Sequence, residues 1–271
     1  MQQLTEGARA VLRTADADAK AAASRDLATA WRAGSIGEVG AAGAPDRPAR
    51  PVTPALRPPR EVPRRKITAA PVGRFALLHA LAHIELNAID LAWDMVARFA
   101  EATTLPRAFF DDWVAVANDE AKHFQMLQSR LGDLGGGYGD LAAHDGLWQA
   151  AEETAHDLLA RLAIVPMVLE ARGLDVTPAM ITKLTNAGDH DSAAVLEIIA
   201  HEEIGHVAIG KRWFLWLCET RGVADPKAAW QSLVRLHFRG LVKPPFNESA
   251  RTEAGLPPDY YEPLSERCLN G

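Results

Sequence analysis

The chain has 271 residues, 48% of which are hydrophobic, and its formal net charge is −6. This length supports one large core, or one core with an appended arm. The acidic balance excludes a global electrostatic attraction to nucleic acid or to an anionic membrane surface. The two cysteines exclude a disulfide framework and a thiolate zinc site, so we expect no structural disulfide partner. Because we find neither the apolar region of a signal peptide nor an apolar run of membrane-spanning length, we expect a soluble cytoplasmic protein with no membrane partner.

The N-terminal part of the chain differs in composition from the rest. Residues 1–40 are expected to form an N-terminal helical segment, with one or two short amphipathic helices between about 4 and 32. Residues 41–70 are rich in proline and arginine and predict an extended, partly polyproline arm. We favour solvated arginines on an arm that wraps the main body, and a grip on nucleic-acid phosphates is the alternative. The basic residues concerned are Arg47, Arg50, Arg57, Arg60, Arg64, Arg65 and Lys66.

Residues 71–240 form the main body and carry long segments rich in Ala, Leu and Ile with helical spacing. Helices are expected at about 71–101, 106–131, 146–173, 190–221 and 226–239, with a short one near 178–186. Strand-like alternation is almost absent, so the predicted fold class is all-α, with four long helices forming a bundle. Residues 241–271 carry two Pro-Pro pairs, cannot form one continuous helix, and are expected to wrap the bundle as an extended C-terminal tail.

Two segments repeat the same arrangement of an acid and a histidine. "NDEAKHF" places Glu120 three residues before His123, and "HEEIGHV" places Glu203 three residues before His206. A rotation of about 100° per residue puts both pairs inside the apolar stripe that faces the core of each helix. A carboxylate buried without a partner would cost several kcal/mol or become neutral. The two pairs therefore indicate a shared partner, for which a multivalent cation is the simplest choice.

The other two long helices each bring one further glutamate to the apolar face. Glu85 lies in "HALAHIELNAIDLAW" and Glu170 lies in "ARLAIVPMVLEARG". Glu120 follows Glu85 by 35 residues and Glu203 follows Glu170 by 33, which fits two helical hairpins joined by a longer crossover. A set of buried salt bridges is the alternative, but these faces carry no Lys or Arg at their centres. The predicted metal ligands, which would also carry any catalysis, are Glu85, Glu120, His123, Glu170, Glu203 and His206.

These motifs resemble the signature of ferritin-like carboxylate-bridged di-iron proteins, which is Glu plus Glu-x-x-His given twice. The resemblance covers about residues 71–221. The segments "LHALAHIELNAIDLAWD", "VPMVLEARGLDVTP", "GHVAIG" and "KPPFNESAR" resemble a bacterial ferritin-like family catalogued only as a domain of unknown function, family four-five-five. The resemblance implies a ferritin-like four-helix bundle with a long crossover and a relation to tRNA-hydroxylating di-iron monooxygenases. It also implies two bound iron ions, with manganese or a mixed iron–manganese pair as the alternative, and O₂ as co-substrate.

The resemblance also assigns a supporting role to the acid that precedes each ligand glutamate. In such sites this acid accepts the free N–H of a ligand histidine from the other half and fixes its tautomer. Asp119 would act in this way on His206, and Glu202 would act on His123. Glu202 departs from the usual aspartate at this position.

Three functions are compatible with such a site. The first is an O₂-dependent oxidase or hydroxylase of an organic substrate, either a small molecule or a modified nucleoside in tRNA. The second is an iron-handling ferroxidase without an organic substrate, and the third is a metal-stabilised scaffold for a partner. We rank the enzyme first because the long segments before and after the bundle suit enclosure of a substrate better than assembly of a storage shell. The sequence leaves the oligomeric state open.

A second polar cluster is expected on the far side of the first long helix. His79, His83 and Asp90 lie together there, well away from Glu85. Hydrogen bonding to the arm or to a neighbouring helix is the favoured interpretation, and a second metal site is the alternative. Glu152 and His156 lie too far along the third helix to reach Glu170, and they are expected near the end of the bundle.

Overall fold

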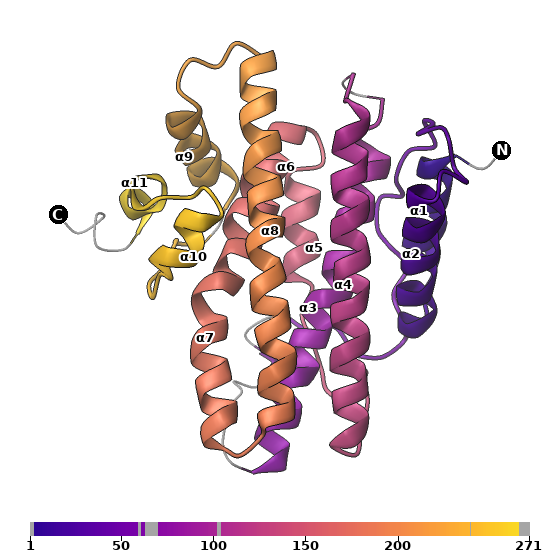
Figure 1. The fold of residues 1–271 in the computed structure, drawn as a ribbon, viewed down its shortest axis with the longest axis vertical. Helices are drawn as coiled ribbons and strands as arrows, with labels where there is room; N and C mark the ends of the chain where they lie inside the picture. The colour runs from indigo at the N-terminus through magenta and orange to yellow at the C-terminus, as the bar shows by residue number, and fades with distance from the viewer. Residues whose placement is uncertain (1–2, 59–60, 63–69, 102–103, 239, 266–271) are drawn as a thin grey trace. The chain divides into compact units, whose positions relative to one another are not determined.

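The computed structural model describes residues 3–58, 61–62, 70–101, 104–238 and 240–265. The regular elements in these residues are all helical, so the all-α prediction is confirmed (Figure 1). The chain divides into two compact units, residues 1–148 with 186–195 and residues 149–185 with 196–271.

The first unit is built around α3 (Pro71–Arg98) and α4 (Arg107–Asp133), which pack side by side (Figure 1). Pro71 occupies the first turn of α3, where the N–H that proline lacks has no partner in any helix. α3 is the one helix, within the part of the chain that the structure describes, that is long and apolar enough to cross a membrane. However, 78% of its most apolar window is buried inside the protein, as in the core helix of a soluble protein.

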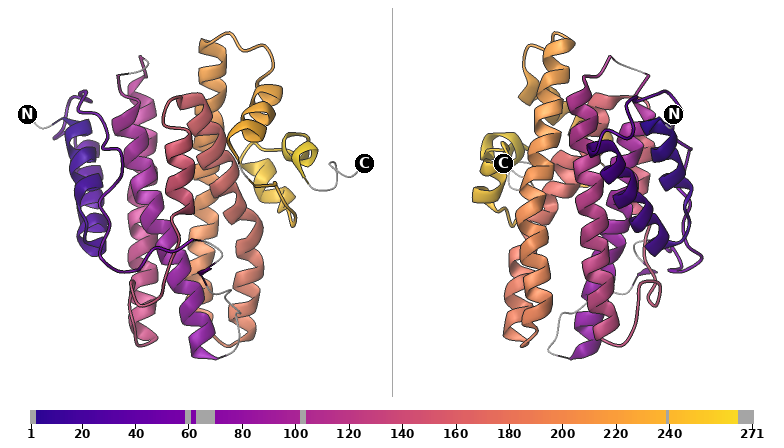
Figure 2. Two further views of the ribbon diagram at one scale, coloured as in Figure 1. Left: turned by 180° about the vertical axis from the view of Figure 1, so that it is seen from behind. Right: turned by 45° about the vertical axis from the view of Figure 1, so that its right-hand side comes forward.

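Helices α1 (Leu4–Arg13) and α2 (Ala17–Arg32) pack on α3 and α4, as two of the views show (Figures 1 and 2). Buried Ser24 of α2 joins the three helices. Its hydroxyl donates to the Ala117 carbonyl at 2.9 Å and accepts from the indole N–H of Trp93 at 2.7 Å. The predicted N-terminal helices are therefore present, and they form part of the core of this unit.

The predicted extended segment after α2 is held by an ion-pair cluster on α3. Asp90 is fully buried, and its two carboxylate oxygens lie 2.5 Å from Lys20 Nζ and 2.5 Å from Arg50 Nη1. Burial raises the pKa of the Asp90 carboxyl, and the nearby charges of Arg50 and Lys20 oppose that shift. The prediction of solvated arginines is wrong for Arg50, because a buried carboxylate needs a cation. Arg60, Arg64, Arg65 and Lys66 lie outside the described residues.

The histidines on the same side of α3 are hydrogen-bonded, as expected, but their partners lie in the loop after α4 instead of the arm or a neighbouring helix. His83 Nδ1 lies 2.8 Å from the Tyr138 hydroxyl, and its Nε2 lies 2.9 Å from the His144 carbonyl. His79 Nε2 accepts from the backbone N–H of Gly139 at 3.0 Å. Burial lowers the pKa of His83 to about 4, so this histidine is a neutral part of the core.

The prediction of one continuous helix at 146–173 is wrong. The structure has α5 (Gly146–Glu153), α6 (Leu158–Ile164) and a π-helical segment η2 (Val165–Glu170). Polar side chains stabilise the break before α6 by forming hydrogen bonds with backbone groups at the helix ends. Asp157 caps the N-terminus of α6, and buried Arg161 donates to the Ala151 carbonyl and the Thr154 hydroxyl.

Helix α7 (Ala171–Asn186) runs through the break that was predicted around residues 174–178, and it absorbs the short helix predicted near 178–186. Pro178 lacks an N–H and would leave the Leu174 carbonyl without its helical partner. The side-chain amide of Asn247 donates to this carbonyl at 3.2 Å and replaces that hydrogen bond. A residue of the C-terminal tail therefore keeps α7 continuous.

Helices α8 (His190–Thr220) and α9 (Pro226–His237) agree with the predictions at 190–221 and 226–239. The C-terminal segment is not one continuous helix, as expected, but the predicted extended chain is wrong. It forms α10 (Glu248–Glu253), α11 (Pro258–Tyr261) and a 3₁₀ turn, η3 (Glu262–Leu264) (Figure 2). Arg251 of α10 makes a bidentate, buried ion pair with Asp175 of α7 at 2.7 Å, which fixes this segment in the second unit.

We predict that Asp90→Ala destabilises the protein by about 3–5 kcal/mol, because it leaves Lys20 and Arg50 as uncompensated charges at a buried position. Urea denaturation followed by circular dichroism measures the change. Asp133→Ala is the matched control, since Asp133 is an exposed partner of Arg130 on α4, and its loss should change stability by less than about 0.5 kcal/mol. Equal losses of stability in the two variants would contradict the assignment of Asp90, Lys20 and Arg50 as a stabilising ion-pair cluster.

Candidate metal centre

The first unit brings three of the six predicted ligands together. Glu85 comes from α3, and Glu120 and His123 come from α4, one turn apart; their exposed fractions are 5%, 1% and 0%. His123 Nδ1 lies 3.2 Å from Glu85 Oε2 and 3.6 Å from Glu120 Oε2. The three residues each offer one ligand atom, and these atoms lie within 4.8 Å of one another. The group is therefore close enough to hold one metal ion.

The charge of this group explains why it suits a cation. Burial alone lowers the pKa of His123, but hydrogen bonds and charge from Glu120 and Glu85 raise it to about 11. In the metal-free protein the two carboxylates thus hold a proton on the imidazole. A divalent ion would take over the role of that proton, with His123 as a neutral ligand.

The second unit carries the other three predicted ligands. Glu203 and His206 lie one turn apart on α8; both are buried, and His206 Nδ1 lies 3.4 Å from Glu203 Oε1. Glu170 is half-buried and ends η2. This unit therefore presents a second carboxylate–imidazole pair with a glutamate on a neighbouring helix.

Gly210 allows η2 to approach α8 closely. A Cβ atom placed on Gly210 would lie 2.3 Å from Pro166 Cβ, which is well inside contact distance. Pro166 lies in the first turn of η2, four residues before Glu170, and Gly210 follows His206 by one turn. π-Helical turns within α-helices often occur at functional sites. Sequence periodicity missed this segment, although a proline inside an apolar helical run was a signal for it.

The acids before the ligand glutamates are partly exposed. Asp119 accepts from the Asn118 amide at 3.3 Å, and its Oδ1 lies 3.8 Å from Lys122 Nζ. Glu202 is half-buried. Of the polar pair expected near the end of the bundle, His156 lies next to His237, with ring centroids 5.4 Å apart and ring planes tilted by 48°.

These features define an all-helical protein with a buried cluster of glutamates and histidine that could hold a metal ion. The model of the family described as "Protein of unknown function (DUF455)" matches residues 13–262, so the chain belongs to this family. It is also 42% identical, over 207 residues, to a Haemophilus influenzae protein whose printed name is "Uncharacterized protein". The match covers 75% of this chain and 71% of that protein. No solved structure matches the chain.

We predict that the metal-free protein loses stability as the pH rises above neutrality, relative to a Glu85→Gln/Glu120→Gln variant. The folded state keeps the His123 proton up to about pH 11, whereas an unfolded histidine loses it near 6.5. The stabilisation is therefore fully present below about pH 6.5 and disappears as the pH rises through about 11.

In the variant, buried His123 is neutral in both the folded and the unfolded state above pH 7, so this dependence of stability on pH should vanish. Urea denaturation in EDTA between about pH 7 and 9 measures the free energy of unfolding of both proteins. The difference between the two free energies should change by roughly 1 kcal/mol per pH unit. Parallel stability curves for the two proteins would count against the carboxylate–imidazolium cluster.

Proposed function

We propose that the protein is a ferritin-like di-metal oxidase or hydroxylase. In this proposal α3, α4, the η2–α7 segment and α8 form a four-helix bundle, and the ligand groups of the two units face each other. Glu203 joins Glu85, Glu120 and His123, and Glu170 and His206 complete a set of four carboxylates and two imidazoles. The observation that carries the proposal is the buried Glu85–Glu120–His123 group, whose ligand atoms converge within 4.8 Å.

The donor set suits iron best. Carboxylate oxygen and imidazole nitrogen are ligands that bind Fe²⁺ and Mn²⁺ well, and the described cluster holds no thiolate that would favour zinc or copper. We propose two iron ions, with manganese or a mixed pair as the alternative. When bound, such a metal pair would supply the activation of O₂ for oxidation of an organic substrate.

The residues of the chain would set the conditions for that chemistry. Glu85 and Glu120 hold a proton on His123 until metal displaces it, and the burial of these side chains keeps water away. Asp119 and Glu202 are proposed to orient His206 and His123 through the second ring nitrogen of each. We expect the substrate to be a small organic molecule or a nucleoside in tRNA.

A ferroxidase that handles iron without an organic substrate would use the same donor set. The C-terminal segment favours the enzyme, because Arg251 and Asn247 tie it into α7 through buried Asp175 and the Leu174 carbonyl. Chain that is built into the core in this way suits a closed pocket better than the outer surface of a shell subunit.

The first test removes the two ligand histidines. We predict that His123→Ala/His206→Ala abolishes stoichiometric iron binding, measured by metal analysis after anaerobic loading and desalting. His201→Ala is the matched control, because His201 lies exposed on the same helix as His206 and should leave about two metals per chain bound. A double variant that retains two metals per chain would refute the ligand assignment.

The second test separates the enzyme from an iron store. Given Fe(II) and air, the full-length protein should stop at about two irons per chain and remain a small assembly on size-exclusion chromatography. A hollow particle that accumulates tens of irons per chain would instead establish storage and exclude the oxygenase. Ferritin supplies the positive control for iron accumulation in the same buffer.

A further inference from the structure

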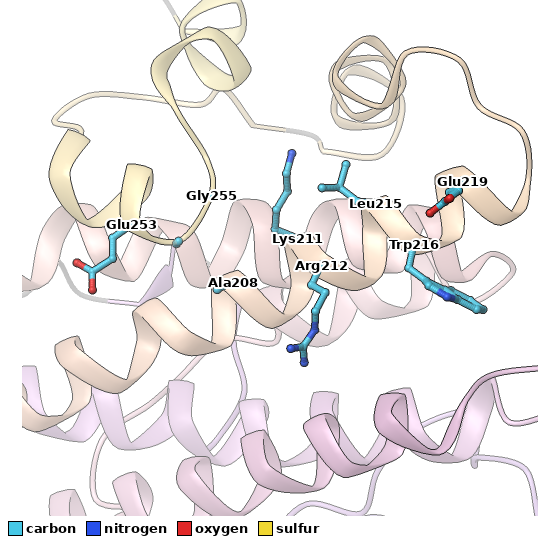
Figure 3. A pocket seen from close by; sticks show the side chains of 9 residues that line it. Ala208, Lys211, Arg212, Leu215, Trp216, Glu219, Glu253 and Gly255 are labelled. Carbon is cyan, nitrogen blue, oxygen red and sulfur yellow. The ribbon is translucent and has the colours of Figure 1, made fainter.

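Two histidines of the second unit, His156 and His237, lie outside the proposed set of metal ligands. His156 is exposed in the turn between α5 and α6, and His237 is the last residue of α9. The open hollow of about 500 Å³ in Figure 3 lies on α8 and the end of α10, and the described residues that line it include no histidine. The histidine pair is therefore a separate feature of this unit.

Polar contacts fix the two segments that carry these histidines to the same helix. The indole N–H of Trp230 on α9 donates to the Ala163 carbonyl on α6 at 3.1 Å, which ties α9 to α6. Asp157 directly follows His156 and accepts from a backbone N–H in the first turn of α6 at 3.4 Å. The same carboxylate lies 2.7 Å from Arg221 Nη1. The turn before α6 and the helix α9 are therefore both anchored on α6.

The spacing of the two rings suits a shared metal ion. The ring centroids of His156 and His237 lie 5.4 Å apart, and the ring planes are tilted by 48°. Two imidazoles that bind one tetrahedral Zn²⁺ at Zn–N distances of about 2.0–2.1 Å have their ring centroids roughly 5 Å apart. The observed separation is close to this value, so the pair could share an ion after small movements of the side chains.

One ring nitrogen of His237 is available as a ligand. His237 is half-buried, its Nδ1 is fully buried, and among the described residues this atom has no hydrogen-bond partner. Buried side-chain nitrogens are nearly always hydrogen-bonded or bound to an ion, so this atom is an exception that a metal would explain. His237 also ends α9, where the last carbonyls of the helix carry partial negative charge and favour a cation.

We propose that His156 and His237 bind a Zn²⁺ ion, which links the end of α9 to the turn before α6. Glu152 precedes His156 by four residues, about one helical turn, and supplies the carboxylate of a set of two histidines and one glutamate. Water takes the fourth position of the tetrahedron. Imidazole nitrogen selects zinc over hard ions such as Mg²⁺, which prefer oxygen ligands. The proposal uses the second unit alone and does not depend on the proposed di-metal centre.

The test is protection of His156 from diethyl pyrocarbonate in the full-length protein. The reagent acylates the lone pair of an accessible imidazole nitrogen, and a lone pair that binds zinc cannot react. A small molar excess of Zn²⁺ should slow the labelling of His156 at least about 10-fold, measured by peptide mass spectrometry. His201, an exposed histidine of α8, is the internal control and should be labelled equally fast with and without zinc. Mg²⁺ should protect neither histidine.

Variants locate the protection at the histidine pair. In His237→Ala, zinc should slow the labelling of His156 less than about 2-fold, whereas His201→Ala should keep the full protection. Labelling of wild-type His156 that zinc does not slow would overturn the proposal and show that the two rings only pack against each other. Protection that persists in His237→Ala, or that extends equally to His201, would also overturn it. The wild-type measurement needs no variant to fold, and its outcome is independent of iron binding elsewhere.

Discussion

A buried carboxylate must be matched by positive charge, and this requirement governs the structure of both units. Asp90 is matched by Lys20 and Arg50, which ties the N-terminal helices and the following segment to α3. Asp175 is matched by Arg251, which ties the C-terminal segment to α7. These two ion-pair groups link segments that are distant in the sequence. Glu85 and Glu120 lie against His123, a group that can give up its proton, and this is what a metal-exchanging site requires.

The helical framework fits this division of roles. The ion pairs of Asp90 and Asp175 lie where segments that are distant in the sequence meet the long helices, whereas the proposed ligands lie on the long helices themselves. Rigid helices place ligand atoms more reproducibly than loops, which favours a preformed metal site. The π-helical segment of the second unit adds a local departure from regular geometry beside Glu170, and the close contact between Pro166 and Gly210 shows why α8 needs a residue without a side chain there.

Periodicity predicted the long helices well because each buries a continuous apolar stripe, and it placed Glu85, Glu120 and His123 on faces that do meet. It failed between residues 146 and 186, where the break before α6 depends on particular polar side chains and the continuity of α7 depends on a side chain far along the chain. Asn247 satisfies the carbonyl that Pro178 leaves, and no local pattern announces a partner about 70 residues away. Lys20 was missed for the same reason. A lysine within an alanine-rich helix carries no period of its own, and only its surroundings make it the partner of a buried carboxylate.

We propose that the carboxylate–imidazole groups of the two units share a pair of metal ions. The most direct measurement is anomalous X-ray scattering at the iron absorption edge from crystals of the full-length protein loaded anaerobically with Fe(II). We predict two adjacent peaks, with Glu203 joining Glu85, Glu120 and His123 as ligands and with Glu170 and His206 completing the ligand set. No peak at these residues, or a single ion held by one unit alone, would contradict the proposal.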